Sequence, residues 1–279
     1  MSSFTDFIQY DFLLYSLIGA ILLSLASGPL SPLIIAKRQA FMGGAVSHST
    51  LLGLALGLWW IETQNTLLLF LFTLVTTLVL TLILARQSFK EKLPEESFIG
   101  IFYTITMALG ILVHSQNAQN KGDLMSYLFG NVLMLSPEDL IIASIPTILS
   151  LVTIKLLWKQ WSFWAYDPEG AQVAGHPIKL WHYLFYLLQT LIIVSGLKLV
   201  GIVLIQAFLL IPGHFALKIS KDIKSTYRNS LIFAVSTSII GLYLANLFEL
   251  PAGASMAVVQ FIGLALTTII LNLKERGLS

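Results

Sequence analysis

The residues with the most distinctive chemistry lie in the stretch GGAVSHSTLLGLALG, which runs from Gly43 to Gly57. Ser47 and His48 are polar residues in a segment that is otherwise suited to lipid. A titratable ring at membrane depth is costly and therefore marks a candidate functional site, and neutral imidazole is a ligand for borderline divalent metals. We predict that His48, with Ser47, faces a metal pathway. The alternative, which the sequence leaves open, is that His48 forms a hydrogen bond across a tight helix pair and only holds the bundle together.

Small residues on the same segment favour close helix packing. Ala45, Ser49, Gly53 and Gly57 recur every four residues and share one helical face. Small side chains at this spacing let a neighbouring helix approach closely within a membrane. Gly44 and His48 are stacked one turn apart, so the histidine is expected beside a glycine-lined gap.

The rest of the chain supplies the helices that would hold this site. Hydrophobic residues make up 56% of the 279 residues and charged residues only 11%, against about 25% charged residues in a soluble domain. We predict an all-α, polytopic membrane helix bundle that forms a single domain over residues 1–279, because an open sheet edge is not stable in lipid. Nine hydrophobic segments are expected to span the bilayer: 12–36, 43–61, 66–85, 97–114, 138–158, 179–196, 199–217, 229–248 and 252–273.

Basic residues predict the orientation of the bundle in the membrane. All sixteen lysines and arginines except Lys121 and Lys198 fall in or beside loops on one face of this map. The positive-inside rule assigns that face to the cytoplasm, with the C-terminus inside and the N-terminus outside. The segments 179–196 and 199–217 are separated by only a few residues, and the alternative is a single re-entrant unit that would change the count.

Two loops are longer than simple turns require. The outer loop, residues 114–140, contains an apolar piece, Leu124 to Leu135, which we interpret as an interfacial or partly inserted helix. The inner loop, residues 161–181, contains a short capped helix, with Asp167 as the cap and Pro168 in the first turn. This helix either docks another protein or lies on the bilayer surface, and the residues alone do not choose between these alternatives.

Several function classes are excluded or disfavoured by missing motifs. There is no P-loop, so any ATP hydrolysis is expected on another chain, and there is no HExxH or GxSxG motif. The chain has no cysteine and so no thiolate metal site. Every acidic residue lies in or next to a loop, which argues against a proton-driven carrier. The basic residues are spread among loops, and no nucleic-acid partner is expected.

Five stretches, in order, carry a resemblance to a known family. They are GPLSPLIIAKRQAFMGGAVSHSTLLGLALG, DLMSYLFGNVLMLSPEDL, DPEGAQVAGHPIKLW, LKLVGIVLIQAFLLIPGHFA and GLYLANLFELPAGASMAVV. Together they cover nearly the whole chain, which resembles the permease subunits of ATP-binding-cassette importers for manganese, zinc and iron. The resemblance implies a type II importer-like bundle in the bacterial plasma (inner) membrane.

The same resemblance implies partners and a mechanism. A second copy of the permease, cytoplasmic ATPase subunits and an extracytoplasmic metal-binding protein are expected, with no permanently bound cofactor. The short inner helix would be the coupling helix that docks on the ATPase, which favours the docking alternative. Its residues are Asp167, Pro168, Glu169, Gly170, Ala171, Gln172, Val173, Ala174 and Gly175.

The chain also departs from the family pattern. The resemblance implies a mid-membrane metal site of the form GDA-x-SH, in which His48 matches but Gly44 stands where the family has an aspartate. His214 lies in IPGHFA where the family has IPAATA, and we hypothesise that His214 partly replaces the missing ligand. Glu249, before LPAGAS at an outer helix start, is a candidate to receive the incoming cation, although a solvated loop acid is the simpler interpretation.

The sequence therefore predicts the permease subunit of an ATP-driven importer of zinc, manganese or iron. It is not itself expected to be an enzyme. The alternatives are a secondary carrier for a small solute, and a membrane scaffold or sensor that transports nothing.

Overall fold

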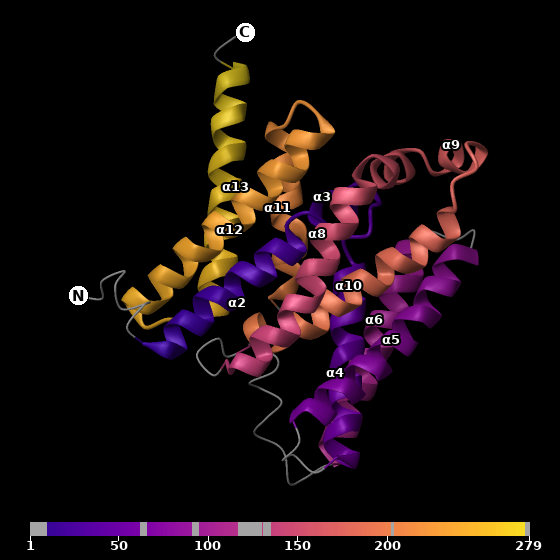
Figure 1. Ribbon diagram of the computed structural model, residues 1–279, viewed down its shortest axis with the longest axis vertical. Helices are drawn as coiled ribbons and strands as arrows, with labels where there is room; N and C mark the ends of the chain where they lie inside the picture. The colour runs from indigo at the N-terminus through magenta and orange to yellow at the C-terminus, as the bar shows by residue number, and fades with distance from the viewer. Residues whose placement is uncertain are drawn as a thin grey trace.

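The structure is a computed structural model that describes residues 10–61, 66–90, 95–116, 130, 135–201 and 204–276. Within these residues all regular structure is helical. The long helices are α2 (Asp11–Ser27), α4 (Met42–Trp60), α5 (Thr66–Lys90), α6 (Glu95–Gln116), α8 (Pro137–Tyr166), α10 (Ile178–Val200), α11 (Ile205–Ile219), α12 (Ile223–Phe248) and α13 (Ala252–Arg276), and the short ones are α3 (Ser31–Ala36) and α9 (Pro168–Val173). Figure 1 shows them as one inclined bundle.

Six helices are long and apolar enough to cross a membrane: α5, α6, α8, α10, α12 and α13. The 15-residue α11 and the 17-residue α2 are apolar but shorter, about 22 and 25 Å long at 1.5 Å per residue. The 19-residue α4 is not among the six candidates, and it is the helix that contains Gly43, Gly44, Ser47 and His48. The multi-pass architecture is therefore established, and the count of nine spans stays a prediction.

The first predicted span is wrong as a single helix. Residues 12–36 form α2 and α3, separated by a turn at Gly28–Leu30. Pro32 lies in the first turn of α3 and has no N–H to continue the ladder from α2. The carbonyl oxygens left free near the break accept hydrogen bonds from other helices: Ala26 from the Ser150 hydroxyl (2.6 Å) and Gly28 from the Ser230 hydroxyl (2.6 Å).

Several of the predicted helices were also too short. The helix predicted at 138–158 continues to Tyr166, so α8 includes the start of the expected inner loop, and α12 begins at Ile223 rather than at 229. Hydropathy marks the part of a helix that lipid favours, whereas caps mark where a helix begins and ends. Asp222 caps α12 by accepting a hydrogen bond from the Ser225 N–H at 2.8 Å.

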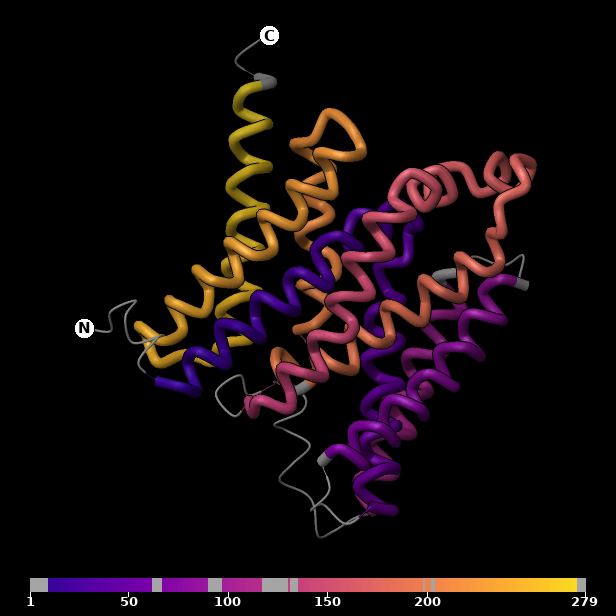
Figure 2. The backbone as a smooth tube through the Cα atoms, viewed as in Figure 1, coloured from indigo at the N-terminus to yellow at the C-terminus, as the bar shows by residue number. Residues whose placement is uncertain are grey.

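The helix predicted at 179–196 reaches Val200 in the structure, and α11 starts at Ile205. Between them Gly201 has φ +86°, a backbone conformation that glycine adopts readily. In Figures 1 and 2, α11 turns back from the end of α10. The apolar piece predicted at Leu124–Leu135 lies mostly outside the described residues.

The helix connections that carry most of the basic residues gather at one end of the bundle. The α3–α4 turn, α9, the α11–α12 turn and the end of α13 lie toward the upper end in Figures 1 and 2. The α12–α13 turn lies toward the other end. The bundle therefore has one basic end, as the distribution of lysine and arginine predicted.

Candidate functional site

His48 lies inside the bundle, on α4, which contacts α5, α6, α10 and α11. It is the seventh of the 19 residues of the helix, and its side chain is 9% exposed. The rise of a helix puts it about 9 Å from the start of α4 and about 18 Å from its end. The structure therefore places this imidazole well away from both ends of a buried helix.

The His48 ring packs on an aromatic neighbour but lacks a full set of polar partners. The Tyr103 ring, on α6, meets it edge-on, with 4.3 Å between ring centroids and an interplanar angle of 77°. Nδ1 of His48 and the hydroxyl oxygen of Ser47 are buried, and neither has a hydrogen-bond partner among the described residues. An unsatisfied buried polar atom costs about 1–3 kcal/mol, and each such atom in a folded protein calls for an explanation.

Gly44, one turn before His48, is covered by two side chains from other helices. A Cβ at this position would lie 2.5 Å from Nε2 of Gln206, on α11, and 3.0 Å from Cε2 of Tyr103. The α4, α6 and α11 helices thus meet around Gly44. Gln206 is one of several polar residues within the apolar segments, and nothing in the sequence links it to His48. Tyr103 carried no signal that would have identified it.

The small residues of α4 face a close neighbour. A Cβ at Gly53 would lie 3.1 Å from the carbonyl oxygen of Thr73, and one at Gly57 would lie 2.7 Å from a methyl group of Leu69, both on α5. Ala45 and Ser49 are fully buried, and the Ser49 hydroxyl donates to the Ala45 carbonyl at 2.7 Å. The Gly53–Gly57 part of this face accordingly packs against α5.

His214 and Glu249 lie away from His48. His214 is exposed on α11, eight residues beyond Gln206 and hence about 12 Å further toward the basic end. Glu249 is exposed at the end of α12, where its φ of +55° places it in the left-handed region. No group of three or more His, Asp or Glu side chains that could hold a metal occurs within the described part of the chain. Among the described histidines, His48 and His182 are buried. Nε2 of His182 lies 2.9 Å from the carbonyl oxygen of Ala85, whereas Nδ1 of His48 has no partner among the described residues.

The short helix α9 projects from the basic end of the bundle. The Asp167 carboxylate accepts from the Gly170 N–H at 2.8 Å, and the positive φ of Gly175 (+80°) follows the helix. Ala171 is buried against the bundle, whereas Val173 is 90% exposed, an unusual position for an apolar side chain. An exposed apolar residue on a capped helix leaves a face free for a partner.

Aromatic residues connect the end of α8 to the turn that leads into α4. Nζ of Lys37, which follows α3, lies 4.3 Å from the ring centroid of Trp164. Trp164 is itself buried against Phe185 and Trp161. Gln39 follows in the same turn, and its amide nitrogen donates to the Tyr186 hydroxyl at 3.4 Å. The α9 end of α8 is therefore in contact with the turn that leads into α4.

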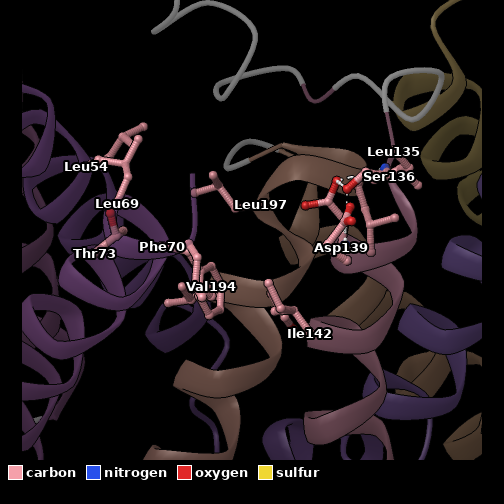
Figure 3. A pocket seen from close by; sticks show the side chains of 14 residues that line it. Leu54, Leu69, Phe70, Thr73, Leu135, Ser136, Asp139, Ile142, Val194 and Leu197 are labelled. Atoms are coloured by element: carbon pink, nitrogen blue, oxygen red, sulfur yellow. Dashed lines mark hydrogen bonds between the residues drawn. The ribbon is translucent and has the colours of Figure 1, made fainter. Parts of the chain in front are cut away.

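A cavity of about 470 Å³ lies between α4, α5, α8 and α10 (Figure 3). Its walls are mostly apolar and include Leu54, Phe70 and Val194, while Ser136 and Asp139 form a polar edge. The Asp139 carboxylate accepts from the Ser136 N–H at 2.9 Å and from its hydroxyl at 3.0 Å, which makes this edge the capped start of α8. This cavity could not be predicted from the sequence, because its walls come from four separate helices.

The fold and the site together define a polytopic α-helical membrane protein with a buried polar helix and a capped helix exposed at its basic end. The chain belongs to the ABC 3 transport family, whose sequence profile matches residues 9–272.

Relatives and a solved structure agree with this assignment. The manganese transport system membrane protein MntC of Halalkalibacterium halodurans is 31% identical over 256 residues, which cover 92% of this chain and 86% of that protein. The manganese import system permease protein ScaB of Streptococcus gordonii is 32% identical, with 90% of each chain covered. The structure of PsaBC from Streptococcus pneumoniae in complex with Fab matches with a TM-score of 0.81 and 28% identity, covering 95% of this chain and 94% of that one.

Proposed function

We propose that this chain forms the translocation pathway of an ATP-driven importer for a divalent transition-metal ion, zinc, manganese or iron. The observation that carries the proposal is the buried His48 imidazole with an unpartnered Nδ1, in a chain of this transport family. A neutral imidazole nitrogen is a ligand that such ions accept. A site with few ligands also suits transport, because a transported ion must leave as well as enter.

The proposed importer needs further subunits, because one chain has a single His48 and no P-loop. A second copy of the permease would bring a second His48 to the pathway, and cytoplasmic ATPase subunits would supply the energy. An extracytoplasmic metal-binding protein would deliver the ion. Relatives named as parts of manganese transport and import systems, and the likeness to PsaBC, support this arrangement.

Coupling to the ATPase is proposed to run through α9. Its exposed Val173 and its cap at Asp167 suit docking into a groove on another protein. Motion of α9 would reach α4 through the end of α8 and the contact between Trp164 and Lys37. The basic end would face the cytoplasm, which places the C-terminus inside and the N-terminus outside.

Two further residues complete the proposed route. Glu249 lies at the end of the bundle opposite the basic end and would meet the entering cation. His214 lies on α11 toward the basic end and would meet the ion on its way out. Uptake that is normal in a His214→Ala variant would exclude the second assignment.

The test is ATP-dependent uptake of radioactive metal by the permease reconstituted in proteoliposomes with its ATPase and binding protein. Wild-type complex is expected to accumulate metal only with ATP, and the His48→Ala variant to lose most of this uptake. His114→Ala is the matched control, because His114 lies in the last turn of α6, near its end. Uptake that follows an ion gradient and ignores ATP would favour a secondary carrier, and no uptake under any condition would favour a scaffold or sensor.

A further inference from the structure

The space beside Gly44 is occupied by an amide from another helix. A Cβ at Gly44 would lie 2.5 Å from Nε2 of Gln206, a distance that real Cβ atoms do not show. A Cβ at the neighbouring Gly43 would lie 3.5 Å from Cγ of Gln206. The two glycines of α4 therefore form a recess, and the Gln206 side chain fills it.

The same recess lies one helical turn from His48. Side chains of a helix lean toward its N-terminus, so the His48 ring lies over the turn that contains Gly44. The Tyr103 ring touches both places, since it packs on the His48 ring and lies 3.0 Å from the Gly44 Cβ position. Tyr103 therefore links the recess that the Gln206 amide fills to the His48 ring, whose Nδ1 is buried and unpartnered among the described residues.

The position of Gln206 is fixed by the fold. It is the second residue of α11, which begins just after the break at Gly201. Further along α11, Gly213 lies against the backbone of Ser31, and its N–H donates to the Ser31 hydroxyl at 2.7 Å. Because α11 is held against α3 in this way, its first turn is held against the start of α4.

We propose that Gln206 is a specificity-determining residue of the metal pathway, and that its carboxamide oxygen joins the His48 imidazole in a site built only of neutral donors. The inference rests on the proposed transport function. Oxygen and nitrogen of a carboxamide exchange places by rotation about one bond, so either can face the ion. The Tyr103 ring orients the imidazole.

A neutral site discriminates among divalent ions. Hard ions such as manganese(II) bind mainly through carboxylate and other oxygen ligands, whereas zinc(II) and iron(II) gain more from imidazole nitrogen. Without a carboxylate the hard ions lose the larger share of their affinity. The chain should therefore pass zinc or ferrous iron in preference to manganese.

The experiment uses the reconstituted complex and measures competition between radioactive manganese and zinc. Gln206→Glu keeps the size of the side chain and adds a charge, so manganese uptake relative to zinc should rise by about tenfold or more. Gln206→Met keeps the size but removes both donors, so uptake of both metals should fall by about tenfold or more. Gln260→Met is the matched control, because Gln260 is a fully buried amide on α13.

A pair of variants tests the recess itself. Gly44→Asp displaces the flexible amide end of Gln206 from the recess, so this variant should fold and raise manganese uptake relative to zinc. Gly44→Asp with Gln206→Ala gives the carboxylate more space and should also favour manganese. Unchanged uptake and metal preference in both Gln206→Glu and Gln206→Met would overturn the inference. If wild-type complex transports metal and His48→Ala does not, that result leaves the transport function standing, whereas absence of uptake by wild type would remove both.

Discussion

A close contact between α12 and α13 predicts a measurable loss of stability. A Cβ at Gly241, on α12, would lie 2.5 Å from Cα and 2.9 Å from N of Met256, on α13. Ordinary contact starts at 3.4 Å, so the Gly241→Ala variant must separate the two helices by about 0.9 Å. Main-chain atoms cannot rotate away as a side chain would, and overpacking of this kind costs about 1–3 kcal/mol.

Part of that cost is offset by helix propensity. Alanine is more favourable than glycine in a helix interior by about 1 kcal/mol, which leaves an expected net loss of about 0–2 kcal/mol in the free energy of unfolding. The measurement is unfolding in detergent, followed by circular dichroism. Gly100→Ala is the matched control, because a Cβ at Gly100, on α6, would meet no atom within 4 Å, and this variant should gain stability. If Gly241→Ala were as stable as Gly100→Ala, the close α12–α13 contact would be refuted.

Three further predictions address the pathway, the coupling and the helix caps. Uptake should fall on acidification, because a protonated His48 repels a cation and has no free lone pair. Uptake that is the same at acidic pH as at pH 8 would exclude His48 as a ligand. Lys37→Met should lower the amount of metal transported per ATP hydrolysed, because it breaks the contact with Trp164. Lys159→Met is the control and should change this ratio less, because Lys159 is exposed and lies 5.5 Å from a tryptophan ring. Equal ratios in the two variants would refute the role of the Trp164 contact. Ser136→Ala should destabilise the protein by about 1 kcal/mol through loss of the α8 cap, and unfolding in detergent indistinguishable from wild type would contradict this.

Local sequence signals determined the helical architecture and several details of it. Hydropathy over windows of about 20 residues reports the match between a helix and the bilayer, so it located the membrane helices without any knowledge of their packing. Asp167 and Pro168 marked the start of α9, because a cap acts within one turn of its own helix. His48 stood out because it is a titratable residue inside an apolar segment.

The tertiary structure alone decided which groups surround His48. Gln206 and Tyr103 reach Gly44 from helices that are distant along the chain, and helical periodicity carries no information about which residue of another helix fills a recess. The break between α2 and α3 carried a local signal in Pro32, whereas Ser150 and Ser230, which satisfy its free carbonyl groups, lie on remote helices. Helix caps, apolar helices and single polar residues within them depend on short-range interactions, so they can be predicted from the sequence. Which residues form a site between helices depends on packing across the whole bundle.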